Sequence, residues 1–228
     1  VLAQAVRLAS ARICDRAAAA LELAEMGTTL TVAALLEESV AIAHVGDSRA
    51  WRVTAGGIEQ LTQDHSWVAE QVRAGAMTAE EARRSPLRHQ ITRTVGTTRA
   101  VEPDLLEVEA RAGELILLSS DGLSECLSDQ EIHRIVVGSA DAADACTRLL
   151  DAALAAGAHD NVTVAAMALG PFPAAAGGEQ PGAATAPEAA PPVPQEQAPA
   201  AAAESAPRPV RATDAPAAPP REERAAPD

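Results

Sequence analysis

Three aspartates of this chain lie where strongly apolar segments end or begin. Asp47 and Asp121 each follow an apolar run, and Asp160 shortly precedes another. If these runs are neighbouring strands, their ends converge at one rim of a sheet, and carboxylates gathered there repel one another. A hard divalent cation such as Mg²⁺ or Mn²⁺ removes that repulsion because it prefers oxygen ligands. The three aspartates are therefore candidate metal ligands, and no histidine or cysteine set with zinc spacing competes with them.

Each aspartate also has an ordinary structural interpretation. An Asp-Gly pair such as 121–122 is, taken alone, more often a turn than a ligand. Asp160 and the asparagine after it could start a turn, and Asp47 could form a local ion pair with Arg49 that caps a loop. Spacing alone leaves both interpretations open.

The elements that would position these residues can be predicted from apolar periodicity. Strands are expected over 28–37, 39–46, 114–122 and 161–170, with a hairpin over 50–62 that turns at Gly56-Gly57. Helices are expected over 2–24, 66–75, 78–84, 128–138 and 139–157. Thr78 with Glu81 and Ser128 with Glu131 have the spacing of capping boxes. This mixture predicts an α+β sandwich with a mainly antiparallel sheet.

Composition limits the classes of protein and of partner. The net charge of −14 makes a nucleic-acid backbone an unsuitable partner. No run of 18 apolar residues occurs, so we expect no membrane segment in this chain. The three cysteines have neither metal nor redox spacing, which predicts reduced, mostly buried thiols in a cytosolic protein, and a monomer is our default expectation.

The composition changes sharply near residue 171. Residues 1–170 are long enough for one packed core. Residues 171–228 are dominated by proline and alanine and contain almost no branched aliphatic residues. Such a segment cannot bury enough apolar surface to offset the entropy of ordering, so we expect a disordered linker there. A docking arm for a partner is the alternative.

Six motifs in a fixed order make the chain resemble a known family. They are MGTTL, HVGDSRAW, LTQDHS, ITRTVG, LLSSDGLSE and HDNVTV, between residues 26 and 164. This set resembles the bacterial branch of the PPM, or PP2C-type, serine/threonine phosphatases. The resemblance implies an α/β/β/α sandwich of two antiparallel sheets flanked by helices. It also implies two Mn²⁺ or Mg²⁺ ions bridged by a water molecule, and this water would attack the phosphorus of phosphoserine or phosphothreonine. The implied substrates are proteins phosphorylated by Hanks-type kinases, and the implied location is the cytoplasm.

The resemblance also assigns roles to individual residues. Asp121 and Asp160 would be ligands of the metal pair, and Asp47 with Asp121 would hold a third, weaker metal. The residues expected to orient the ligands or brace their loops are Asn161, Gly122, Ser48 and Arg49. Bacterial relatives place a serine of the flap region near the position of His89 as a ligand of the third metal, and here the residue is histidine.

One departure from the family pattern is large. An arginine that grips phosphate and an aspartate that bridges both metals have no counterpart in residues 1–25. The resemblance therefore leads us to expect an N-terminally truncated copy that lacks the first strands, binds metal weakly and turns over poorly. Two functions stay open: a metal-dependent phosphoprotein phosphatase, and a non-catalytic PPM-like module that binds a phosphoprotein or a kinase. Retention of the three aspartates favours the phosphatase.

Overall fold

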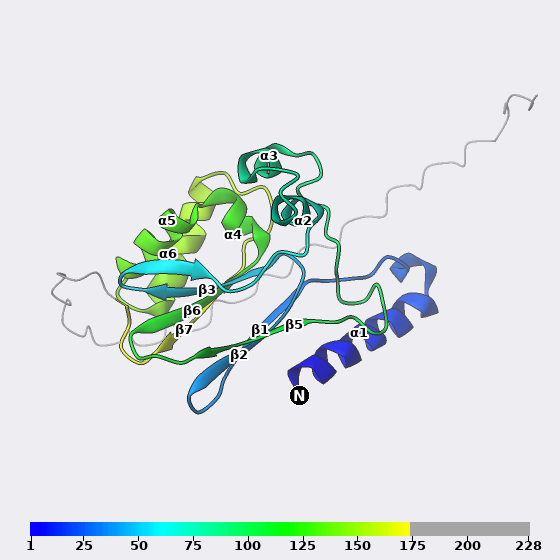
Figure 1. Ribbon diagram of the computed structural model, residues 1–228, viewed down its shortest axis with the longest axis horizontal. Coiled ribbons are helices and arrows are strands. Elements are labelled where there is room, and N and C mark those ends of the chain that lie inside the picture. The colour runs from blue at the N-terminus through cyan, green and yellow to red at the C-terminus, as the bar shows by residue number, and fades with distance from the viewer. Residues whose placement is uncertain (174–228) are drawn as a thin grey trace, which may run out of the picture. The chain divides into compact units, whose positions relative to one another are not determined.

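The computed structural model describes residues 1–173 and contains two antiparallel sheets (Figure 1). The three-stranded sheet has the order β1-β2-β5, with bounds Leu30–Leu35, Ser39–Val45 and Asp104–Glu109. The four-stranded sheet has the order β4-β3-β6-β7, with bounds Gly57–Gln60, Arg49–Thr54, Glu114–Ser119 and Val164–Leu169. The strands β2 and β6, whose sequences are apolar on both faces, each have a neighbour on both sides.

Helices cover the outer face of each sheet. Helix α1 (Leu2–Ala19), followed by a short 3₁₀ turn (Leu21–Leu23), lies against the three-stranded sheet. The four-stranded sheet is covered by α4 (Asp121–Cys126), α5 (Asp129–Val137) and α6 (Ala142–Ala155). Helices α2 (Trp67–Arg73) and α3 (Ala79–Arg84) lie in the segment that connects β4 to β5, and we call this connecting segment the flap. This arrangement confirms the predicted α/β/β/α sandwich.

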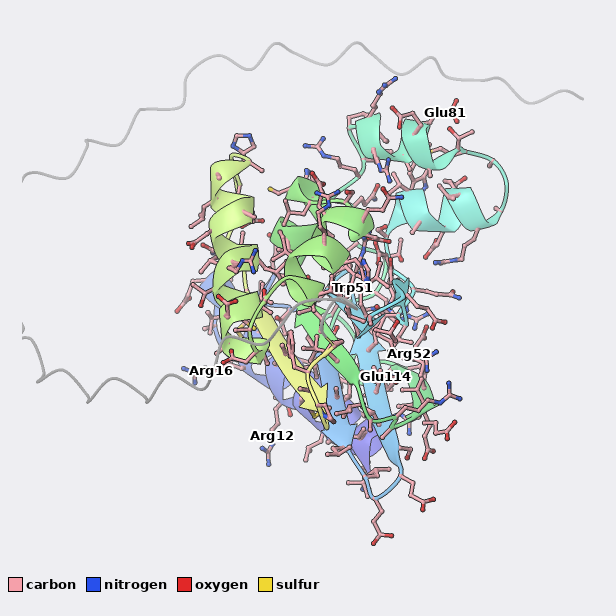
Figure 2. All side chains as sticks on the ribbon, turned by 90° about the vertical axis from the view of Figure 1, so that its left-hand side faces the viewer. Arg12, Arg16, Trp51, Arg52, Glu81 and Glu114 are labelled. Carbon is pink, nitrogen blue, oxygen red and sulfur yellow. The ribbon has the colours of Figure 1, made fainter. Side chains whose placement is uncertain are left out.

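Three apolar layers hold the sandwich together. Between the sheets, Val40 and Ile42 of β2 meet Ile116 of β6, and all three are at most 1% exposed. On the outer face of the four-stranded sheet, the fully buried Trp51 packs with residues of α5 and α6 (Figure 2). On the outer face of the other sheet, α1 contributes Leu2, Val6, Ala9 and Ile13, whose spacing of three to four residues places them on one helix face.

The predicted elements differ from the structure mainly at their ends. The hairpin pairs Thr54 with Gly57, so its turn residues are 55–56, one position earlier than predicted. The first helix ends at Ala19, before the predicted end at residue 24, and Leu21 beyond it is 94% exposed. Both predicted capping boxes are confirmed. The three cysteines are free but half-buried, so the prediction of mostly buried thiols was wrong.

Some expectations concern residues beyond this part of the chain. The predicted linker over 171–228 falls outside the described residues from position 174 onward. Among residues 1–173, no helix combines the length and the apolar character needed to cross a bilayer.

Candidate metal centre

The strand register brings the loops of the three candidate aspartates to one end of the four-stranded sheet. Ser119, the last residue of β6, pairs with Arg49 at the start of β3 and with Val164 at the start of β7. Asp47 therefore lies just before β3, Asp121 just after β6, and the loop of residues 157–163 leads into β7 at the same rim.

Asp121 lies close enough to Asp47 to affect the ionisation of the Asp47 carboxyl. Partial burial and the negative charge of Asp121 raise the pKa of Asp47 from 3.8 to about 6. The guanidinium of Arg49 acts in the opposite direction but does not reverse the shift. A carboxyl that ionises with difficulty beside another carboxylate fits a site for a divalent cation, because the cation supplies the missing positive charge.

The loop that carries Asp160 is tied to the segment that carries Asp121. The hydroxyl of Ser120 donates to the carbonyl of Asn161 at 3.1 Å and accepts from the backbone N–H of Thr163 at 3.0 Å. A side chain at Gly122 would place its Cβ 2.7 Å from the Asn161 carbonyl oxygen, so only glycine permits this approach. The Asn161 side chain itself is exposed and belongs to an exposed turn with Asp160.

The turn that carries Asp47 is held on both sides. Ser48 shares a hydrogen bond with the hydroxyl of Thr29 at 2.9 Å. Arg49 makes a two-pronged ion pair with Asp64, with N–O distances from 2.7 to 3.1 Å. Both groups of the pair are largely buried, and a bidentate geometry of this kind fixes the guanidinium plane. Arg49 thus contacts a carboxylate outside the candidate ligand set.

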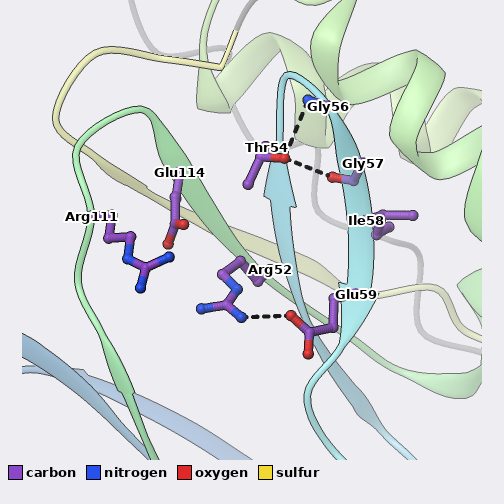
Figure 3. A pocket seen from close by; sticks show the side chains of 8 residues that line it. All are labelled: Arg52, Thr54, Gly56, Gly57, Ile58, Glu59, Arg111 and Glu114. Atoms are coloured by element: carbon purple, nitrogen blue, oxygen red, sulfur yellow. Dashed lines mark hydrogen bonds and ion pairs between the residues drawn. The ribbon is translucent and has the colours of Figure 1, made fainter.

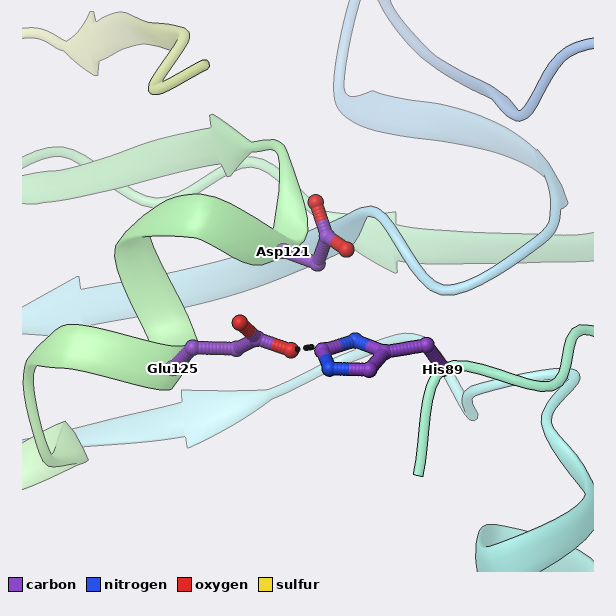
Figure 4. Close-up of side chains that lie close together, drawn as sticks. All are labelled: His89, Asp121 and Glu125. Carbon is purple, nitrogen blue, oxygen red and sulfur yellow. Dashed lines mark ion pairs between the residues drawn. The ribbon is translucent and has the colours of Figure 1, made fainter. Parts of the chain in front are cut away.

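The flap residue His89 meets Asp121 and a further carboxylate, Glu125. The nitrogen and oxygen atoms that these side chains offer lie within 4.8 Å of one another (Figure 4). His89 Nδ1 and Glu125 Oε1 are 2.9 Å apart. Asp47 and Asp160 lie outside this group of three.

Sequence reasoning missed Glu125 as a functional candidate. The available signal was its position four residues after Asp121, which puts both carboxylates on one face of α4 once the segment is known to be helical. The strand predicted over 114–122 includes Asp121 and Gly122, but β6 ends at Ser119 and α4 begins at Asp121, so that part of the prediction was wrong.

One hollow of the surface lies away from these aspartates. A cavity of about 340 Å³ is lined by residues at the β3–β4 turn and at the start of β6, the opposite ends of the strands that lead to Asp47 and Asp121 (Figure 3). Its two arginines already pair with carboxylates, Arg52 with Glu59 and Arg111 with Glu109. Clustered carboxylates are a more specific sign of a reactive site than a polar hollow, so we place the candidate site at the aspartate rim.

Comparisons with known proteins agree with the fold described above. Residues 1–164 match the family model of protein phosphatase 2C, and the chain belongs to this family. Protein phosphatase PhpP of Streptococcus pneumoniae serotype 2 (strain D39 / NCTC 7466) is 40% identical over 144 residues. That match covers 63% of this chain but 58% of PhpP, so the chain spans little more than half of that relative's length. The serine/threonine protein phosphatase PstP of Mycobacterium tuberculosis (strain CDC 1551 / Oshkosh) is 39% identical over 160 residues, or 70% of this chain and 31% of PstP.

Solved structures confirm the family fold. The crystal structure of a bacterial serine phosphatase superposes with a TM-score of 0.71 at 38% identity, over 74% of this chain and 68% of that one. The catalytic domain of PstP, solved in complex with two manganese ions, gives a TM-score of 0.65 at 37% identity, over 72% and 67% of the two chains. The resemblance predicted from the six motifs is thereby confirmed.

Proposed function

We propose that this chain carries the metal-binding rim of a phosphoprotein phosphatase that hydrolyses phosphoserine and phosphothreonine with Mn²⁺ or Mg²⁺. The observation that carries the proposal is the register that brings Asp47, Asp121 and the Asp160 loop to one end of the sheet. The family membership and the two manganese ions in the PstP catalytic domain support a pair of cations.

In this proposal each aspartate is a metal ligand on a separately anchored loop. Asp121 and Asp160 hold the metal pair, and Asp47 with Asp121 holds a third cation. Divalent cations in such a site activate water at neutral pH and neutralise the phosphoryl oxygens. The contacts of Ser120 and Asn161 keep two of the ligand loops together before a cation binds, which lowers the entropic cost of binding.

The residues around the ligands would orient and cover the site. Ser48 and Arg49 fix the turn on which Asp47 lies, through Thr29 and Asp64. His89 stands at the edge of the flap beside Asp121, where it can contribute a nitrogen ligand or shield the site from solvent.

The substrates and setting of the chain follow as further parts of the proposal. We propose that proteins phosphorylated by Hanks-type kinases are the substrates. Three free cysteines suit the reducing cytoplasm, where we place the protein, and a monomer accounts for a rim built from one chain.

The test is release of phosphate from a phosphothreonine peptide by the 228-residue chain with Mn²⁺. Asp121→Asn should reduce the rate by at least about 100-fold, because a catalytic metal contributes several kcal/mol of transition-state stabilisation. Removal of Mn²⁺ by a chelator should abolish the release. Asp151→Asn, an exposed carboxylate of α6, serves as the matched control and should keep the wild-type rate.

Two outcomes would contradict this function. A rate that is unchanged in Asp121→Asn would remove this residue from the metal site. Tight binding of the phosphopeptide without phosphate release by the wild-type chain, together with Mn²⁺ binding, would favour a non-catalytic module.

A further inference from the structure

His65 makes two hydrogen bonds to the backbone of Gly46, the residue directly before Asp47. The N–H of Gly46 donates to Nδ1 of the imidazole at 3.0 Å, and the carbonyl of Gly46 accepts from the N–H of His65 at 2.8 Å. His65 is 3% exposed and Gly46 is buried, so water does not replace these bonds. The backbone that leads into Asp47 is therefore fixed by one residue, through its ring and through its backbone N–H.

Thr29 fills the space beside Gly46, so the turn has no room to shift in that direction. Its φ of +114° lies in the region that favours glycine, and a Cβ there would approach Cγ2 of Thr29 to 2.4 Å. The turn is thus held between Thr29 on one side and the imidazole of His65 on the other.

The bond to Gly46 requires one tautomer of His65. An imidazole nitrogen that accepts an N–H has no proton of its own, so in the neutral ring the proton is on Nε2. Nε2 lies 3.2 Å from Oδ2 of Asp104. The ring N–H is not aligned for a full hydrogen bond, so Asp104 acts on it mainly through charge. A carboxylate beside Nε2 favours the tautomer that Gly46 needs.

The surroundings of His65 also fix the plane and the charge of the ring. The fully buried His44 lies against it, with ring centroids 4.8 Å apart. Burial lowers the pKa of His65, which keeps the ring neutral and Nδ1 free to accept. Arg93 pairs with Asp104, and Thr92 donates its N–H to the carbonyl of His65 at 2.8 Å. The segment that leaves the flap is thereby joined to the turn of Asp47.

We propose that His65 is a positioning residue for the Asp47 carboxylate, acting through the backbone of Gly46, and that Asp104 selects the tautomer required for this role. The inference rests on the proposed function, in which Asp47 is a metal ligand. His65 itself touches neither the ligand set nor the substrate.

Two substitutions separate the two sides of the imidazole. Asparagine at position 65 places an amide oxygen near the position of Nδ1 and can still accept from Gly46. Glutamine reaches the position of Nε2 and the side of Asp104, but offers nothing to the Gly46 N–H. A third variant, Asp104→Asn, presents an amide N–H to Nε2 and should favour the opposite tautomer, with a proton on Nδ1 facing Gly46.

The first measurement is the nitrogen-15 NMR spectrum of the His65 ring in the wild-type 228-residue chain without metal. We expect the tautomer with the proton on Nε2, and a shift toward the other tautomer in Asp104→Asn. A wild-type ring that carries its proton on Nδ1 would overturn the inference, whatever the variants do.

The second measurement is the Kd for Mn²⁺ by titration calorimetry. We expect His65→Gln to weaken the Asp47-dependent binding about 10-fold, the size typical of groups that orient metal ligands, and His65→Asn to stay within about 3-fold of wild type. In an Asp47→Asn background, His65→Gln should change the Kd by less than about 2-fold, because the Asp47 carboxylate through which His65 acts on the metal is already absent.

The outcomes distinguish this inference from the proposed function. If Asp47→Asn weakens Mn²⁺ binding while His65→Gln does not, the positioning role is wrong and the ligand role of Asp47 stands. If Asp47→Asn leaves Mn²⁺ binding unchanged, the ligand role itself fails. Equal weakening in His65→Gln and His65→Asn, with equally lowered thermal unfolding midpoints, would make His65 a purely structural residue and overturn the inference.

Discussion

At the scale of single residues, Asp47 lowers the stability of the metal-free protein. Its pKa is raised to about 6 from 3.8, so the folded protein disfavours the charged form and the unfolded chain does not. Above about pH 6 this cost is fully present, and below the unfolded pKa it disappears. A residue that is unfavourable for folding and lies at a cluster of carboxylates is typical of a binding site.

We therefore expect Asp47→Asn to raise the thermal unfolding midpoint of the metal-free protein by about 2–4 °C at about pH 7.5. This corresponds to ~1 kcal/mol for a domain of this size, after allowance for solvent screening of a partly exposed group. Most of the gain should be lost at about pH 3.5, where the carboxyl is fully protonated in the folded protein and mostly protonated in the unfolded chain. Scanning calorimetry at the two pH values measures it. A lower midpoint at neutral pH would mean that the Asp47 carboxylate stabilises the turn.

At the scale of elements, the two capped helices α3 and α5 have different relations to the core. Both begin with a complete capping box, Thr78 with Glu81 and Ser128 with Glu131. Helix α5 buries Ile132 and Val136 against the four-stranded sheet, whereas α3 has no buried residue. The flap helix should therefore unfold locally without the rest of the domain.

This difference predicts unequal effects of equivalent substitutions. Ser128→Ala should lower the free energy of unfolding in urea by about 1 kcal/mol, the usual cost of a lost N-cap. Thr78→Ala should leave the free energy of global unfolding within about 0.5 kcal/mol of the wild-type value. It should instead speed hydrogen exchange at the amides of α3. Equal losses of global stability in both variants would place the flap helix in the main cooperative unit.

The elements that the sequence predicts well are those with strong local signals. Caps, long amphipathic helices and doubly apolar strands such as β2 depend on residues close together in the chain. Strand β5 was missed because Leu105 interrupts the alternation of its apolar side chains, and α4 because six residues are too few for a helical period. The contacts of His65 and Glu125 join residues from separate elements, so only the folded chain reveals them.

At the scale of the whole domain, two buried histidines make stability depend on pH. Burial lowers the pKa of His44 and of His65 below 6.5, so the unfolded chain binds protons that the folded chain does not. The contribution of the two histidines to stability is complete above about pH 6.5, and it is lost as the pH falls toward the pKa values of the rings in the folded protein. Asp47, whose pKa is raised, changes the stability in the opposite direction: its effect makes the folded protein more stable as the pH falls from about 6 to 4.

Removal of Asp47 should therefore expose the effect of the histidines. We expect the free energy of unfolding of Asp47→Asn to fall more steeply than that of wild type as the pH decreases from about 6.5 to 4.5. Urea unfolding at several pH values measures both slopes, with unchanged m-values as the sign that the unfolded state is the same. A stability that rises on acidification in this variant would show that the two rings are charged in the folded protein.

The burial of Trp51 has a practical consequence for optical spectroscopy. The chain contains two tryptophans and no tyrosine, so its intrinsic fluorescence comes almost entirely from two indoles. Trp51 lies in the apolar layer beneath α5 and α6, with its ring N–H unpartnered, and should emit at short wavelength. Trp67 begins α2 at the base of the flap. In Trp67→Phe the remaining fluorophore would report on the core. In Trp51→Phe the remaining fluorophore would report on the flap.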